Sequence, residues 1–237
     1  MDKRLLRAAG FLSCALILGV AVHSRAALAG QKGAALFDEE KGKFNILLDG
    51  KSVGHENFEI SPSGSTWVAV GTTELKVPDS PSTKVTGKLT LQPDGSPVAY
   101  EWSSQSDKTN GAQISFANGV AKIILQMQGA RPFEQDLTFG TPLISVLDNN
   151  LYDQYAVLAR VYDWSKGGSQ TFPVLIPQEL TPGTITVESM GSTKDDGKSY
   201  EGLRVTTNDL EVQLLLDSSH RLQRIEVPSA KVSVIRE

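Results

Sequence analysis

The chain has 237 residues, with 23 basic and 27 acidic side chains and a formal net charge of −4. This balance excludes the basic footprint that nucleic-acid binding needs, and it offers anionic lipid head groups no electrostatic attraction. The single cysteine, Cys14, excludes an internal disulfide, so stability must come from a hydrophobic core.

The first 29 residues have the pattern of a secretory signal peptide. A basic start is followed by an apolar run over residues 8–22 and by the small-x-small pattern Ala27-Leu28-Ala29. The apolar run is shorter than the ~20 residues that span a bilayer. We expect cleavage after Ala29 and export to the periplasm or the exterior, with no stable transmembrane span afterwards. Retention of the segment as an anchor is the alternative.

Removal of residues 1–29 leaves 19 basic and 26 acidic side chains and no cysteine. The remaining length suits one domain with its own core. Residues 30–43 are polar and contain glycine, which predicts a flexible lead-in. Residues 44–237 are predicted to form a single β-rich domain.

Period-two alternation dominates this domain and predicts roughly eleven short strands. Phe44, Ile46 and Leu48 alternate with their neighbours, and Asp49-Gly50 then suits a tight hairpin turn. A second hairpin, with its turn at Asn118-Gly119, is predicted from "QISFANGVAKIILQMQ".

Residues 141–163 break the pattern and predict an amphipathic helix. Thr141 is a suitable N-cap and Pro142 suits the first helical position. The predicted apolar stripe comprises Ile144, Leu147, Leu151, Tyr155, Leu158 and Tyr162. Asn149, Asp153 and Arg160 are expected on the solvent side, with Asp148 and Gln154 at the edges of the stripe.

The polar motifs do not complete any standard catalytic or metal site. A calcium loop that starts at Asp148 would need Gly at the position of Asp153 and Glu at the position of Ala159. After processing only His55 and His220 remain, too few for a structural zinc site. No cofactor is expected. A Ser-His-Asp triad assembled by folding stays open as a weak alternative.

Two hairpin motifs resemble a group of secreted bacterial β-rich domains of unknown function. The stretch "FNILLDGKSVGHENFEI" is similar to their opening hairpin, and "LLLDSSHRLQRIEVP" is similar to their closing hairpin. Such domains resemble in turn the periplasmic lipoprotein carriers of the LolA type. The resemblance implies a curved antiparallel half-barrel with helical cover and an apolar cavity for acyl chains.

The predicted fold is therefore mainly β: one curved antiparallel sheet, forming a half-barrel or open barrel, with one amphipathic helix over one face. The predicted function is non-catalytic binding of a hydrophobic small molecule, a lipid or a lipid-anchored partner. The predicted cavity is lined by Trp67, Trp102, Leu147, Leu151, Tyr155 and Leu158, with Asp148 and Gln154 at its polar rim. The same apolar residues would serve equally as plain core. An interaction module that docks on a secreted enzyme or an envelope complex is the alternative, and a hydrolase that uses His55 or His220 is a weaker one.

Overall fold

A computed structural model describes residues 35–195, 197–207 and 209–237, which belong to one compact unit. The predicted signal peptide, its cleavage site and the first residues of the predicted lead-in lie outside these ranges. None of the helices within the ranges has the length and apolar character needed to cross a bilayer.

Fifteen strands, one α-helix and two short 3-10 helices make up the described residues. The elements are β1 (Glu40–Leu48), β2 (Lys51–Ser63), β3 (Thr66–Leu75), β4 (Thr83–Leu91), β5 (Pro97–Gln105), β6 (Thr109–Ala117), β7 (Val120–Met127), β8 (Phe133–Thr138), β9 (Ser145–Val146), α1 (Asp153–Val161), β10 (Ser169–Ile176), η1 (Pro177–Glu179), β11 (Thr181–Asp195), β12 (Lys198–Thr206), β13 (Glu211–Leu216), β14 (Leu222–Val227), η2 (Pro228–Ala230) and β15 (Val232–Arg236). The strands outnumber the predicted eleven.

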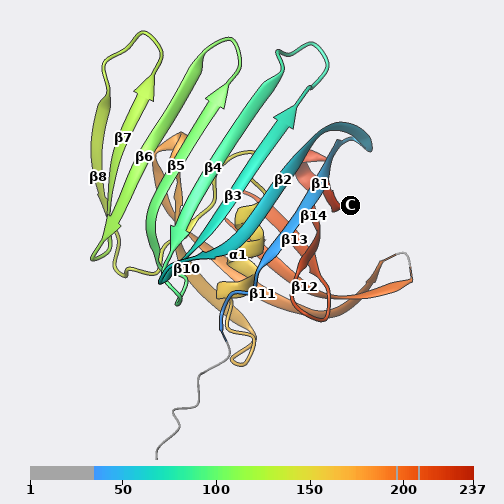
Figure 1. The fold of residues 1–237 in the computed structure, drawn as a ribbon. Coiled ribbons are helices and arrows are strands. Elements are labelled where there is room, and N and C mark those ends of the chain that lie inside the picture. Colours follow the sequence, from blue (N-terminus) through green and yellow to red (C-terminus); the bar gives the residue numbers. More distant parts are fainter. Residues whose placement is uncertain (1–34, 196, 208) are drawn as a thin grey trace, which may run out of the picture. The chain divides into compact units, whose positions relative to one another are not determined.

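All strands join one sheet in the order β8-β7-β6-β5-β4-β3-β2-β1-β15-β14-β13-β12-β11-β10-β9. Every pairing is antiparallel except the short β9–β10 pair. The sheet therefore consists of two meanders, β1–β8 and β10–β15, that join where β1 pairs with β15. It curves but does not close, so β8 and β9 are its edges (Figure 1). The predicted fold class is confirmed.

Two of the tight turns use the residues that the sequence analysis assigned to them. Asp49 and Gly50 have φ of 51° and 75°, and Asn118 and Gly119 have the same pair of values. Positive φ at both central residues is the geometry of the two-residue hairpin turn that matches strand twist, and Asp-Gly and Asn-Gly tolerate it best. These turns fix the register of β1–β2 and β6–β7.

Helix α1 is much shorter than predicted, because residues 142–152 fold differently. Val146 pairs with Leu175 of β10, and the N–H of Leu147 also bonds to the carbonyl of Leu175. Asn150 then adopts a left-handed φ of 62°, which a helix interior cannot accommodate. The stripe residues of this segment, Ile144, Leu147 and Leu151, are still buried, so the amphipathic pattern located the core correctly but assigned the wrong backbone to half of it.

The inner face of the sheet is the face that carries α1, which contacts β3 and β14. Glu40 lies at the seam between the two meanders, and its side chain is almost fully buried. Arg160 of α1 pairs with Glu40 at 3.0 Å, and Arg236 of β15 pairs with it as well. The prediction of a solvent-facing Arg160 was wrong, because its side chain is 8% exposed. Strand β1 also begins at Glu40, inside the predicted lead-in.

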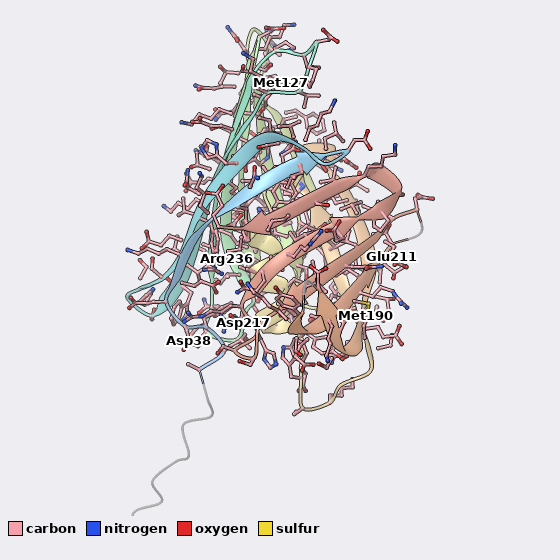
Figure 2. The ribbon with its side chains drawn as sticks, turned by 90° about the vertical axis from the view of Figure 1, so that its right-hand side faces the viewer. Asp38, Met127, Met190, Glu211, Asp217 and Arg236 are labelled. Atoms are coloured by element: carbon pink, nitrogen blue, oxygen red, sulfur yellow. The ribbon has the colours of Figure 1, made fainter. Side chains whose placement is uncertain are left out.

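Burial on the inner face decreases along the strands of the first meander. On β7, Ala121 and Ile123 are 0% and 1% exposed, Leu125 is half-buried and Met127 is 43% exposed. The strands continue beyond the part of the sheet that α1 covers (Figure 1), and Met127 lies far from Arg236 in the side view (Figure 2). We call the ends of β4–β8 that bear Met127 and the neighbouring turns the distal end.

Candidate functional site

A buried carboxylate from the sheet caps the N-terminus of α1. Glu56 of β2 is fully buried and accepts hydrogen bonds from the N–H groups of Tyr152 and Asp153, at 2.7 and 2.8 Å. Thr73 of β3 donates its hydroxyl to the same carboxylate at 3.1 Å. The helix has no side-chain cap of its own, so Glu56 supplies the acceptor that its first N–H groups need.

Asp153 lies beside Glu56 and is 2% exposed, which corrects the prediction that it faces solvent. A Cβ on Gly71 would lie 2.6 Å from Oδ1 of Asp153 and 3.1 Å from Oε1 of Glu56, so the glycine leaves room for both carboxyl groups. Burial raises the pKa of Asp153 to about 6, and burial together with the charge of Asp153 raises the pKa of Glu56. Two buried carboxyl groups this close retain a proton between them because both cannot ionise cheaply.

A second buried cluster joins β5 to the segment before the helix. Asp148 accepts a hydrogen bond from the Tyr100 hydroxyl at 2.8 Å, and Gln154 donates to that hydroxyl at 3.1 Å. The other carboxylate oxygen of Asp148 accepts the N–H groups of Asn149 and Gln178, both at 3.0 Å. Burial nevertheless outweighs these donors and raises the pKa of Asp148 to about 6.

These clusters anchor the helix to the sheet. Asp148 and Gln154, the predicted polar rim, are 5% and 2% exposed and form part of the interior. Of the two, Gln154 borders a cavity of about 10 Å³, roughly the space of one water molecule. Among the described residues, no group of three or more His, Cys, Asp or Glu side chains could hold a metal ion.

The space between helix and sheet is filled by the residues that were predicted to line a cavity. Leu147, Leu151 and Leu158 are buried in the core. Leu151 packs where a Cβ on Gly87 would stand, 2.6 Å from its nearest methyl group. These three side chains therefore act as core in this structure, which is the second of the two interpretations that their pattern allowed.

The remaining predicted lining residues lie at the margins of that core. Trp67 is half-buried and its ring lies 5.7 Å from the ring of Phe37. Tyr155 is half-buried, and burial raises the pKa of its hydroxyl to about 12. Trp102 is 8% exposed, and its indole Nε1 is buried without an acceptor among the described residues. Trp102 is the predicted lining residue that lies closest to the distal end.

One apolar row on the inner face connects Trp102 to the edge of the sheet. The strand register places Trp102 opposite Ala112, Ala112 opposite Leu125, and Leu125 opposite Phe133. Phe133 is 46% exposed, and Met127, beside this row, is 43% exposed. Sequence analysis missed this surface, although Leu125, Met127 and Phe133 all occupy inward positions of their strands. We call Trp102, Ala112, Leu125 and Phe133 the apolar row.

The two histidines lie in different hollows. His55 lines an open hollow of about 680 Å³ near the distal end, together with Glu74 and Lys84. His220 stacks on Trp164 with ring centroids 3.8 Å apart and lines a hollow of about 360 Å³ beside Arg160. Burial, with the charge of Arg160, lowers the pKa of His220.

The opposite, outer face of β3–β8 is polar. It carries an open hollow of about 640 Å³ above Gly111, bordered by threonine, serine and glutamine side chains. Thr86 and Ser103 hydrogen bond to each other there at 2.7 Å. This face lacks the large apolar side chains of the distal end, apart from Val70 and Ile124, which are 39% and 38% exposed.

No protein-family model matches the sequence, and no curated protein sequence matches it. A solved structure from Brucella abortus, described as a β-barrel-like protein of domain of unknown function DUF1849, is similar in fold. The likeness has a TM-score of 0.55 at 10% identity and covers 84% of this chain and 94% of the other. A DUF1089 family protein from Pseudomonas aeruginosa has 12% identity and a TM-score of 0.45, over 72% of this chain and 92% of that one. The first likeness supports the β-rich, barrel-like architecture, and the second is too distant to bear on it.

Proposed function

We propose that the chain is an exported, non-catalytic binding protein that uses the distal end of its sheet to hold an apolar segment of another envelope protein. The observation that carries this proposal is the loss of cover along the inner face. Of the five large apolar side chains that are exposed among the described residues, Met127 of β7 and Phe133 of its partner β8 lie together on the inner face at the distal end. Such a gathering of apolar surface favours an interaction site.

Three features argue for a binding role rather than catalysis. The carboxyl groups whose pKa values are raised lie within the core, where Glu56 and Asp153 are 0% and 2% exposed. Strong pKa shifts occur in structural networks as well as in active sites, and here Glu56 and Asp148 each accept backbone hydrogen bonds that anchor the segment around α1. The two histidines line different hollows, which disfavours their joint service in one catalytic site.

The test compares capture of partners from envelope extracts by three forms of the chain. The double variant Met127→Ser/Phe133→Ser removes the exposed apolar surface of the inner face. Ile124→Ser removes an equally exposed apolar side chain from the outer face of the same strand and serves as the control. We expect one protein, identified by mass spectrometry, to be retained by the wild type and the control and lost by the double variant. Equal retention by all three forms would overturn the proposal.

Carriage of a lipid or another amphipathic ligand is a second candidate function, favoured by Trp102. Its indole N–H has no acceptor in the described part of the chain and lies in the apolar row, so an ester or carboxyl oxygen of a ligand could accept that hydrogen bond. Because the space under α1 is filled, the ligand would have to lie along the row or displace the helix. Solvent extraction of the purified chain, with mass spectrometry, and uptake of a fluorescent fatty acid test this function. Absence of both lipid and uptake would reject it.

A further inference from the structure

The free edge of β8 presents its unpaired backbone groups in a defined pattern. The N–H of Phe139 bonds to the carbonyl of Gly119 at 2.7 Å, directly after the Thr138–Val120 pair. Hydrogen bonding alternates along an antiparallel strand, so Leu137, Gln135 and Phe133 direct their backbone groups toward β7. The two-residue turn at Asn118-Gly119 requires the same alternation along β7: the backbone groups of Val120 point toward β6 and those of Ala121 point toward β8.

The residues between them direct their N–H and C=O groups away from the sheet. These residues are Glu134, Asp136 and Thr138, and all three side chains are exposed on the outer face. Among the described residues, no backbone hydrogen bond from another segment reaches this side of β8. The edge is therefore a template on which one more strand can form.

The side chains around this edge select what could pair with it. On the outer face an added strand meets the carboxylates of Glu134 and Asp136, with Glu101 nearby and Lys122 as the local cation. On the inner face it meets Phe133 and the half-buried Leu137. A strand that alternates basic and apolar side chains complements both faces, since opposite charges on directly opposed residues stabilise a sheet.

A second copy of this chain fits the edge poorly. Antiparallel pairing of two β8 strands about Gln135 would place Glu134 of each copy opposite Asp136 of the other. Like charges directly opposed across strands are destabilising. Acidic side chains on a free edge thus disfavour self-association while they leave the edge open to a basic strand.

We propose that β8 binds an extended segment of a partner protein by strand addition, and that the segment alternates apolar residues with Lys or Arg. The segment lies antiparallel to β8, with its basic side chains over Glu134 and Asp136 and its apolar side chains against Phe133 and Leu137. Main-chain hydrogen bonds supply affinity in this mode, and the alternating side chains supply specificity. This inference rests on the proposed binding function of the distal end and specifies its partner.

The probe is the capped heptapeptide Val-Thr-Val-Lys-Val-Lys-Val, titrated into the 15N-labelled chain that begins at Gly30. We expect amide shifts concentrated in β7 and β8. Replacing both lysines of the peptide with glutamate should weaken binding about three- to tenfold or more, from two reversed cross-strand charge pairs. The variant Glu134→Lys/Asp136→Lys should invert that preference, and unchanged circular dichroism would show that it is folded.

Peptide N-methylation separates strand addition from simple charge attraction. In the proposed register the N–H groups of the two lysines point at β8, whereas those of the intervening valines point away. N-methyl groups on the lysines should abolish binding, and N-methyl groups on two valines should leave an affinity within about threefold of the parent peptide. Equal effects of both modifications, or a charge preference that the double variant does not invert, would overturn strand addition.

The outcome also separates this inference from the function on which it rests. If the partner captured from extracts depends on Met127 and Phe133 but is retained by Glu134→Lys/Asp136→Lys, the distal end binds without strand addition and the inference is rejected alone. If no captured partner depends on the distal end while the peptide binds as described, the proposed function is rejected, and strand addition at β8 is supported on its own.

Discussion

Strands β5–β8 pass through two different environments. Toward the end that bears the Asn118-Gly119 turn, inward side chains of β5 and β7 are fully buried: Tyr100 and Ala121 are both 0% exposed. At the distal end, Met127 and Phe133 occupy inward positions as well, but their side chains are 43% and 46% exposed. The alternation is continuous across both regions, so it shows that a strand has an apolar face and does not show what covers that face. Cover comes from α1 and from the opposite meander.

The same substitution at a fully buried position of the second meander and at the distal end gives the largest expected contrast. Leu214→Ala, at a fully buried position of β13, should lower the free energy of unfolding by about 2–5 kcal/mol. Leu125→Ala, at the half-buried margin of the distal end, should cost less than about 1 kcal/mol. Urea denaturation measures both. Equal losses would mean that the distal end is packed in solution and that the two regions do not differ.

The polar cap of the covered region is expected to have the next largest effect. Glu56→Ala leaves the N–H groups of Tyr152 and Asp153 without their acceptor, which should cost about 2–4 kcal/mol. Glu56→Gln keeps an acceptor oxygen and should cost less. Glu59→Ala, exposed on the same strand, is the matched control and should change stability by less than about 0.5 kcal/mol. A loss for Glu59→Ala as large as that for Glu56→Ala would show that the strand, and not the cap, is being disturbed.

The pH dependence of stability should also arise in the covered region. The folded chain raises the pKa of both Asp148 and Asp153 to about 6 and therefore holds their protons more tightly than the unfolded chain does. Their stabilising contribution is fully present below about pH 4 and is lost as the pH rises through about 6, by an amount on the order of 3 kcal/mol for each group. Urea titrations at pH 4.5 and 8 measure this loss.

Asp153→Asn provides the control for the pH prediction. Asparagine cannot lose a proton, so the variant should show a smaller difference in stability between the two pH values than the wild type. An unchanged difference would assign the pH dependence to groups outside this cluster. Substitutions at the distal end, such as Met127→Ser, should not alter the difference in stability between the two pH values, because Met127 does not belong to the buried network.

The smallest expected effect concerns individual amides of β8. Amides of Gln135 and Leu137 bond to β7 and should be protected from hydrogen exchange, whereas those of Glu134 and Asp136 face solvent and should exchange freely. Two-dimensional NMR after transfer to heavy water resolves the alternation. Uniform protection along β8 would indicate that something already covers its edge.

Local patterns predicted the strands well because each depends on neighbouring residues. Asp49-Gly50 and Asn118-Gly119 specify their turns through φ values that few other pairs tolerate. The helix was overextended because the pairing of Val146 with Leu175 joins segments far apart in the chain, and that tertiary contact overrides helix periodicity.

The polar residues were harder to place because their burial depends on distant partners. Asp153 and Arg160 lie opposite the apolar stripe of α1, and exposed positions are the usual place for charges. Glu56 and Glu40, from the first two strands, instead meet them inside the domain. Gly71 could have hinted at this, since a glycine in the middle of a strand often marks the close approach of another group.

The pairing of β1 with β15 has a consequence for how the chain acquires its structure. The first and last strands in chain order lie at the centre of the sheet, while its two edges, β8 and β9, are consecutive in the chain. Each meander can form from local hairpins, but the seam must bring together segments such as Glu40 and Arg236, almost the full domain length apart. Closing so long a loop is slow, because its entropy is lost before its contacts form. Until the seam closes, β1 and β15 are two further open edges, and both meanders are exposed to mispairing.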